Sequence, residues 1–184
     1  MTASSYVVTG GARGVGRAIT ERLAGHGGHV IVVDIVDRLG WTFEGVELIG
    51  GDAADPRIAA RAAHAAEASG ELIGWVNNAA VFQDAGIATA SAAAIVDLIT
   101  ANLALAVTGC HTAINHFLAH RRPGAIVNVS SHQAQRAVRG ALPYSTAKAA
   151  LEGLTRAAAV DHGPDGIRVN AVCLLYTSPS PRDS

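Results

Sequence analysis

Tyr144 and Lys148 are the two side chains whose types and spacing point most directly to chemistry. The chain has 13 arginines but one lysine, and that lysine follows the tyrosine by four residues, one turn of a helix predicted over residues 144–162. A free phenol has a pKa near 10, so stabilising its phenolate at neutral pH needs roughly 4 kcal/mol. A cation about 4 Å away at an effective dielectric near 20 supplies roughly that amount. The pair predicts an acid/base tyrosine; the alternative is a helix-start aromatic beside a solvated lysine.

A glycine-rich segment, residues 9–16, stands where the first predicted strand turns into the first predicted helix. Glycine lets a diphosphate approach the backbone closely, and a helix amino end presents free N–H groups. An acidic residue closes the next predicted strand, where a ribose-binding carboxylate is expected. Taken alone, the glycine-rich segment could be a flexible loop, and the acidic residue could be a strand-end residue or a helix cap. Taken together, they predict a dinucleotide site. Its expected residues are Gly10, Arg13, Gly14, Val15, Gly16 and Asp34.

Two of these residues bear on the choice of cofactor. Asp34 can accept hydrogen bonds from both ribose hydroxyls of NAD and would repel a 2′-phosphate, whereas Arg13 could attract that phosphate. A carboxylate at the phosphate's own position imposes a direct like-charge penalty, while the arginine can turn toward solvent or the diphosphate. NAD is therefore the predicted cofactor, and NADP is disfavoured.

The elements that must position these residues alternate along the chain. Short β-branched runs lie at residues 6–9, 29–34, 46–49, 72–76, 125–129 and 167–172, and most show no polar alternation, as expected of strands covered on both faces. Helical stretches are predicted at 14–26, 55–69, 91–119 and 144–162. Right-handed βαβ crossovers then predict an α/β fold with a doubly wound, Rossmann-like parallel sheet. Residues 35–51 are too few for the usual helix, so a loop is expected there.

The glycine spacing TGxxxGxG resembles that of the short-chain dehydrogenase/reductase family, and further motifs follow in the family's order. Asp52-Ala53 resembles its adenine-contacting pair, and the segment that includes Asn78 and Ala79 resembles its NNAG motif, with alanine in place of the final glycine. Asn102 matches its active-site asparagine. Ser131, Tyr144 and Lys148 match its serine and YxxxK motif, with the tyrosine 13 positions after the serine. The resemblance covers residues 5–172.

The resemblance implies an oxidoreductase that moves a hydride between NAD(H) and a small alcohol or ketone. Tyr144 would exchange the hydroxyl proton, Ser131 would orient the substrate oxygen, Lys148 would hold the ribose and lower the tyrosine pKa, and Asn102 would seat a proton-relaying water. Ser130 rivals Ser131, and Asn102 could instead cap a neighbouring loop. An epimerase or dehydratase that uses NAD transiently, and a nucleotide-sensing homologue without catalysis, remain alternatives. A homo-oligomer, dimer or tetramer, is expected.

Composition excludes other classes of partner. The net charge of −1 and the absence of a long basic run argue against nucleic acid. The apolar stretch 87–110 contains Asp97 and Asn102, so it predicts a buried helix rather than a membrane span. Two cysteines without a CxxC motif fit the cytoplasm. His116 and His120 have helical spacing but no third ligand in sequence, so a solvated helix end and no metal are expected.

The last twelve residues differ in character from the rest. Residues 173–184 read CLLYTSPSPRDS and match a translated sequencing-adapter frame, so we expect an artefactual or disordered tail. Residues 1–172 would then form a single, incomplete dinucleotide-binding domain without its last helix and strand. A chain ending there is expected to fold loosely and to lack useful turnover.

Overall fold

The computed structural model describes residues 3–175, and within them the predicted alternation of strands and helices is confirmed. The strands are β1 (Ser4–Thr9), β2 (His29–Asp34), β3 (Val46–Gly50), β4 (Glu71–Asn77), β5 (Gly124–Ser131) and β6 (Ile167–Leu174). The α-helices are α1 (Gly14–Ala24), α2 (Pro56–Ser69), α3 (Ala92–Ala119) and α4 (Leu142–His162). Two short 3-10 turns, His132–Ala134 and Gly163–Asp165, precede α4 and β6. No helix separates β2 from β3, as expected.

The six strands form one parallel sheet in the order β3-β2-β1-β4-β5-β6. The chain moves outward from β1 in one direction as far as β3, then returns to place β4 on the other side of β1. This reversal defines a switch point between β1 and β4, at whose carboxyl ends a parallel sheet opens a crevice. The doubly wound α/β architecture predicted from sequence is confirmed.

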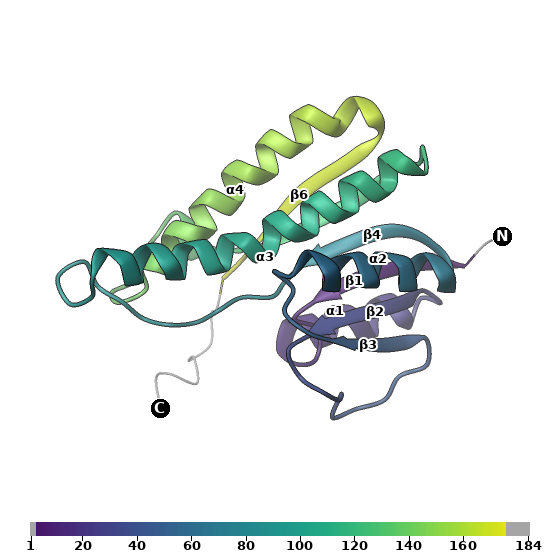
Figure 1. Ribbon diagram of the computed structural model, residues 1–184, viewed down its shortest axis with the longest axis horizontal. Helices are drawn as coiled ribbons and strands as arrows, with labels where there is room; N and C mark the ends of the chain where they lie inside the picture. Colours follow the sequence, from purple (N-terminus) through teal and green to yellow (C-terminus); the bar gives the residue numbers. More distant parts are fainter. Residues whose placement is uncertain (1–2, 176–184) are drawn as a thin grey trace.

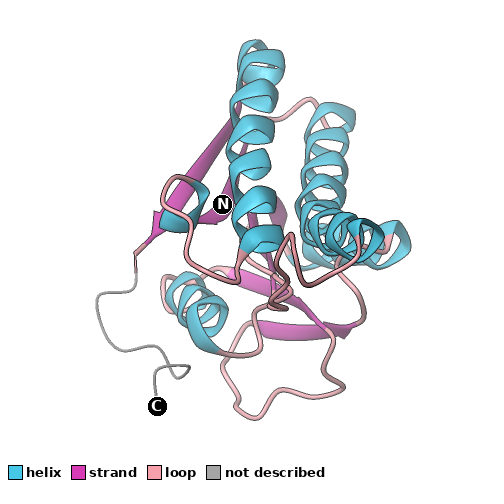
Figure 2. Ribbon diagram, turned by 90° about the vertical axis from the view of Figure 1, so that its left-hand side faces the viewer, coloured by secondary structure: helices cyan, strands magenta, loops and turns pink. Residues whose placement is uncertain are grey.

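Side chains alternate between two cores on opposite faces of the sheet. Val7 and Trp75 point into the larger core, which α2, α3 and α4 cover; Val8 and Val76 point into the smaller one, beneath α1. Figures 1 and 2 show these helices flanking the sheet. The near-continuous apolar strands follow from burial on both faces.

Capping residues and prolines determine where the helices next to the site begin. Asp55 caps α2 by accepting the Arg57 N–H at 2.8 Å, and Pro56 fits the first turn, where its missing N–H loses no bond. Pro143 does the same at the start of α4, which explains why that helix begins two residues before the predicted 144. The start of α4 in turn sets where Tyr144 faces.

Helix α3 is buried on one side only, which corrects the expectation of a buried helix. By length and composition it could cross a membrane, with a mean hydropathy of 1.8, and 28% of its most apolar window is inside the fold. Its 28 residues extend about 42 Å, whereas the seven residues of β4 extend about 23 Å. The helix therefore overhangs the sheet, alongside α4 (Figure 1).

Strand β6 lies at the edge of the sheet and passes the predicted boundary at residue 172. Cys173 and Leu174 pair with Ser130 and Ser131, because β5 itself continues to Ser131 and offers them backbone partners. The remaining nine residues of the predicted tail, 176–184, lie outside the described residues.

Candidate functional site

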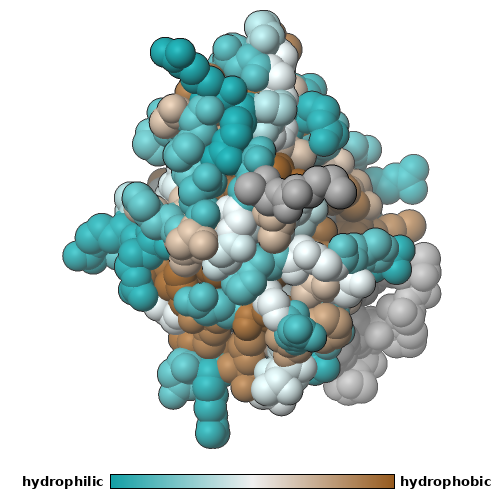
Figure 3. Space-filling model, turned by 90° about the vertical axis from the view of Figure 1, so that its right-hand side faces the viewer, coloured by the Kyte–Doolittle hydropathy of each residue, from teal (hydrophilic) through white to brown (hydrophobic). Residues whose placement is uncertain are grey.

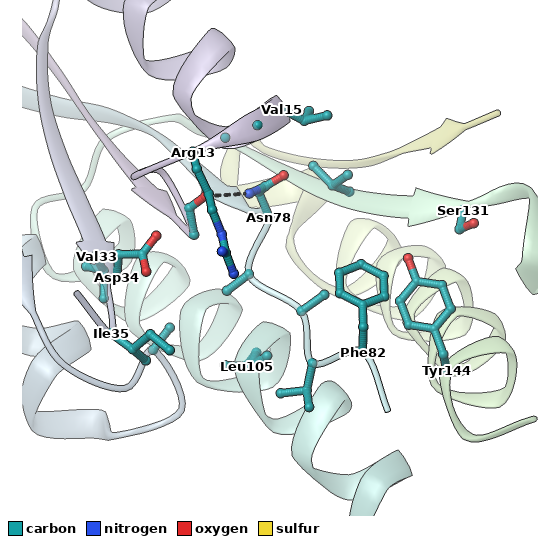
Figure 4. Close-up of a pocket in the computed structure, with 18 of the residues that line it drawn as sticks. Arg13, Val15, Val33, Asp34, Ile35, Asn78, Phe82, Leu105, Ser131 and Tyr144 are labelled. Atoms are coloured by element: carbon teal, nitrogen blue, oxygen red, sulfur yellow. Dashed lines mark hydrogen bonds between the residues drawn. The ribbon is translucent and has the colours of Figure 1, made fainter. Parts of the chain in front are cut away.

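A cavity of about 470 Å³ opens at the carboxyl ends of the strands, beside the switch point. It brings together all but one of the residues that the sequence predicted for the site. Those lining it are Gly10, Arg13, Gly14, Val15, Gly16, Asp34, Asp52, Ala53, Asn78, Ala79, Ser131, Tyr144 and Lys148. Figure 4 shows Asp34 and Tyr144 toward opposite ends, with Arg13 and Asn78 between them. The cavity is therefore elongated, as a dinucleotide requires.

The glycine-rich segment is built for close approach. Gly10 has φ +65°, and a Cβ there would lie 2.8 Å from Ala79 Cα. A Cβ on Gly16 would overlap the Gly10 carbonyl oxygen. Gly14, with φ +55°, faces open space within the cavity, just where α1 begins and its N–H groups are unpaired. The first two glycines therefore allow packing, and the third leaves room for a diphosphate.

Asp34 ends β2 with its carboxylate turned toward the glycine-rich segment. Its Oδ2 accepts the Ala12 N–H at 3.0 Å. The Ala12 carbonyl accepts the Trp41 indole N–H at 2.7 Å, and the Arg17 guanidinium lies 5.0 Å from the Trp41 ring centroid. The loop between β2 and β3 thus holds the glycine-rich segment, and Asp34 is fixed in place before any ligand arrives. This role of Trp41 was not predicted from the sequence.

Thr9 joins the carboxyl ends of β1 and β4. Its hydroxyl oxygen accepts the N–H groups of both Asn78 and Ala79 at 3.1 Å. The Asn78 amide in turn donates to the carbonyls of Thr9 at 3.2 Å and Gly10 at 2.9 Å. The segment after β4 is therefore locked onto the glycine turn, which closes one wall of the cavity.

The opposite end of the cavity holds Tyr144, Lys148 and Ser131. Lys148 is 6% exposed; its Nζ donates to the Val129 carbonyl at 2.6 Å and lies 5.5 Å from the Tyr144 ring centroid. Burial lowers the pKa of Lys148 to about 8. The hydroxyl end of the Tyr144 ring is the end nearer Ser131 (Figure 4). A phenol, a buried ammonium group and a hydroxyl thus converge, which suits proton transfer at a substrate oxygen.

The profile of the short chain dehydrogenase family matches residues 5–183. The chain belongs to the short-chain dehydrogenase/reductase family. It is 34% identical to the 2,5-dichloro-2,5-cyclohexadiene-1,4-diol dehydrogenase of Sphingobium indicum, over 94% of this chain and 72% of the relative. It is 34% identical to the L-xylulose reductase of Mesocricetus auratus, over 90% and 68%. The ligand-free aldohexose dehydrogenase of Thermoplasma acidophilum superimposes with a TM-score of 0.82 at 31% identity, over 93% of this chain and 66% of that one.

Within this short-chain dehydrogenase/reductase, the two adjacent serines of β5 differ in their hydrogen bonds. The Ser130 hydroxyl donates to Glu152 Oε1 at 3.1 Å, so its proton is engaged. The Ser131 oxygen accepts the Gln133 N–H at 3.2 Å, which leaves the hydroxyl proton available for another acceptor. Both serines line the cavity, although successive strand side chains point to opposite faces of a sheet. Ser131 is the better placed of the two to hold a substrate oxygen.

Asn102 is the predicted residue that does not line the cavity. Its Oδ1 accepts the Val81 N–H at 2.9 Å, and its Nδ2 donates to the carbonyls of Val81 at 3.0 Å and Leu98 at 3.1 Å. These contacts match the loop-capping alternative. Because it clamps Val81 from the middle of α3, Asn102 positions the segment that leads to Phe82.

Phe82 is the aromatic residue among the lining residues that sequence reasoning missed. The residue is 62% exposed, and its ring centroid lies 5.0 Å from that of Tyr144. An exposed aromatic ring beside an acid/base side chain forms a wall against which substrate can pack. Its place two residues after the Asn77–Ala80 segment was the available signal.

Proposed function

We propose that this protein is an NAD-dependent oxidoreductase that interconverts an alcohol and a carbonyl compound, with Tyr144 as the general acid/base. One observation carries the proposal. A buried ammonium group, Lys148, lies against the Tyr144 ring at one end of the cavity, whose other end carries Asp34 and the glycine turn. That arrangement serves both binding of a dinucleotide and proton transfer beside it.

The residues present fit a nicotinamide dinucleotide. The open space at Gly14 and the amino end of α1 accommodate the diphosphate, and Asp34 faces the site for the adenosine ribose. Asp52 and Ala53 line the adenine end, while Lys148 is within the nicotinamide end. When bound, the cofactor accepts or supplies the hydride. Each side chain named here lines the same cavity.

Proton transfer is assigned to the chain's own residues. In oxidation, the Tyr144 phenolate accepts the substrate hydroxyl proton while the Ser131 hydroxyl donates a hydrogen bond to the same oxygen; in reduction the proton returns. Lys148 Nζ lies 5.5 Å from the Tyr144 ring centroid, and two opposite unit charges at that separation attract by about 3 kcal/mol at an effective dielectric near 20, which favours the phenolate. Asn102 supports the site by holding Val81, and its relay of protons through water stays a prediction.

NAD is proposed over NADP because of how Asp34 is held. Its Oδ2 already accepts the Ala12 N–H, so the carboxylate cannot swing away to make room for a 2′-phosphate without losing that bond. Arg13 lines the cavity but makes no ion pair within residues 3–175, so it stays available to the diphosphate.

The substrate is proposed to be a small polyhydroxylated molecule. The relatives are named for a cyclic diol, a ketose and an aldohexose. A sugar or cyclic polyol presents both hydroxyl groups for Ser131 and a C–H face for the exposed Phe82 ring. The exposed apolar residues of the overhanging α3, such as Val96 and Val107, support a homo-oligomer, and we propose a cytoplasmic location.

The test compares Tyr144→Phe with Tyr6→Phe, a matched loss of one hydroxyl in β1, away from the cavity. With NAD and a panel of polyols, we expect Tyr144→Phe to bind NAD normally but to lose turnover by at least about 10²-fold, and Tyr6→Phe to retain it. Net formation of NADH distinguishes a dehydrogenase from an epimerase or dehydratase. Full turnover by Tyr144→Phe would refute the acid/base assignment, and turnover of the polyols without net formation of NADH would refute the dehydrogenase.

A further inference from the structure

A second cluster of side chains of the kinds that bind metals lies at the amino ends of the strands, at the other end of the sheet from the cavity. Glu67 comes from the last turn of α2, His116 comes from the last turn of α3, and His120 is the residue that caps the end of α3. One donor atom from each of the three lies within 4.8 Å of the others. β4 begins at Glu71, so this is the end of the sheet at which the strands start. Figure 3 shows that much of the surface at this end is hydrophilic.

The two histidines are arranged as a pair of ligands on one helix face. Their rings stack with centroids 4.1 Å apart and an interplanar angle of 28°. His120 Nδ1 lies 2.8 Å from the His116 carbonyl oxygen, so Nδ1 carries the proton and the lone pair of a neutral ring is on Nε2. His120 is exposed at the helix end, so a metal ion from solvent can reach its Nε2. Such a bond from the second ring nitrogen is the usual support of a metal-binding histidine.

Glu67 is oriented toward the same point. Arg122 Nη2 donates to Glu67 Oε1 at 2.7 Å, and the Leu72 N–H donates to Oε2 at 3.1 Å, so the carboxylate cannot rotate freely. Oε2 lies 3.0 Å from His116 Nε2. Arg122 also approaches Glu71 at 3.7 Å, so two carboxylates offset one guanidinium and the cluster keeps a net negative charge.

We propose that Glu67, His116 and His120 bind a divalent cation of the zinc type. One carboxylate and two imidazoles form a frequent zinc ligand set, with the fourth position left to water. Tetrahedral donors bonded at about 2.1 Å lie about 3.4 Å apart, so side-chain rotation has to close the widest separation by at most about 1.4 Å. The two histidines alone predicted no metal; the fold brings in Glu67 from 49 residues earlier.

The cation would have a structural role, as a cross-link between two helices, and not a catalytic one. It would tie the end of α3 to the end of α2 across the start of β4, and the three ligands are all absent from the lining of the cavity. Binding to the folded chain alone stabilises it by mass action. Zinc is therefore expected to raise the thermal midpoint without being required by the hydride-transfer site.

The experiment titrates Zn²⁺ alone into the full chain by calorimetry, with Cys173→Ser in every sample because that thiol is exposed. His120→Gln removes one ligand from an exposed position. His64→Gln is the matched control, since His64 on α2 bonds its own i−4 carbonyl in the same way, at 2.8 Å, but lies outside the cluster.

We expect one Zn²⁺ per chain, at least about a tenfold loss of affinity in His120→Gln, and no change in His64→Gln. Co²⁺ substituted at the site should give the visible spectrum of a four-coordinate ion, and Zn²⁺ should raise the thermal midpoint of the control but not of His120→Gln. Unchanged affinity in His120→Gln, or no saturable binding to the parent chain, would overturn the proposal. Either result leaves the assignment of Tyr144 untouched.

Discussion

Lys148 is predicted to titrate far below an ordinary lysine, and the chain offers an unusually clean way to measure it. Burial without a carboxylate partner lowers its pKa from 10.5 to about 8. The difference corresponds to about 3 kcal/mol for keeping the ammonium charged inside the fold. Because Lys148 is the single lysine, a chain labelled with ¹⁵N-lysine gives one Nζ signal, whose pH titration reports the pKa directly.

The same shift fixes how stability depends on pH. Below pH 8, folded and unfolded chains both carry the proton, and the folded state bears the full desolvation penalty. Between pH 8 and 10.5 the unfolded chain binds a proton that the folded chain lacks, so this lysine makes the unfolding free energy rise with pH by about 3 kcal/mol in total. Lys148→Met should remove that rise, lose turnover, and be no less stable than the parent at pH 7.

The assay is urea unfolding of parent and Lys148→Met at pH 7 and pH 10. The variant loses the Nζ bond to the Val129 carbonyl, worth about 1.5–3 kcal/mol for a charged donor, so near-equal stability at pH 7 is the expected balance. At pH 10 the parent should be the more stable protein. An Nζ pKa above 10, or a variant destabilised equally at both pH values, would refute the reasoning.

Three further predictions follow from the fold and the cavity. Asp34→Ala should lower the ratio of the NADP dissociation constant to the NAD dissociation constant by about tenfold, which corresponds to 1.4 kcal/mol. An unchanged ratio would show that Asp34 does not determine the preference for NAD. Gly10→Ala should weaken NAD binding and stability because its Cβ would meet Ala79, whereas Gly27→Ala, at φ +82° with open space, should cost only about 1–2 kcal/mol of backbone strain in urea unfolding. Val172→Lys on the outer edge strand should reduce self-association in light scattering, and equal association would mean that this edge is not the contact.

Sequence reasoning predicted the strands, the helices and the glycine-rich first turn because these features depend on local sequence pattern. Apolar β-branched runs mark buried strands wherever they pair. Gly16 is required by its approach to the Gly10 carbonyl within the same turn, whereas the contact that requires Gly10 is with Ala79 in a distant segment. The YxxxK spacing likewise needs only a helix. Such patterns can be recognised in the sequence without knowledge of the tertiary structure.

The features that escaped prediction depend on contacts between distant segments. Trp41 donates to the Ala12 carbonyl, and Glu67 contacts His116 across 49 residues. For Asn102 the sequence left two roles open, and the contact with Val81 favours the loop cap. The overhang of α3 is a mismatch between its length and that of the strands beneath it, which no window of sequence displays. The extension of β6 to Leu174 came from its partner strand and not from its own composition.

The Thr9 hydroxyl has a consequence for the order of assembly. It accepts N–H groups from residues 69 and 70 positions later, so the cofactor cradle does not exist until β4 has entered the sheet beside β1. That pairing closes a long loop and is a slow kind of contact to form. During synthesis, a ribosome-bound chain carrying only β1, α1, β2 and β3 has the complete glycine signature and no pocket. Nucleotide capture therefore marks the moment when the centre of the sheet is finished, and the cofactor can protect against proteolysis only those chains that have passed it.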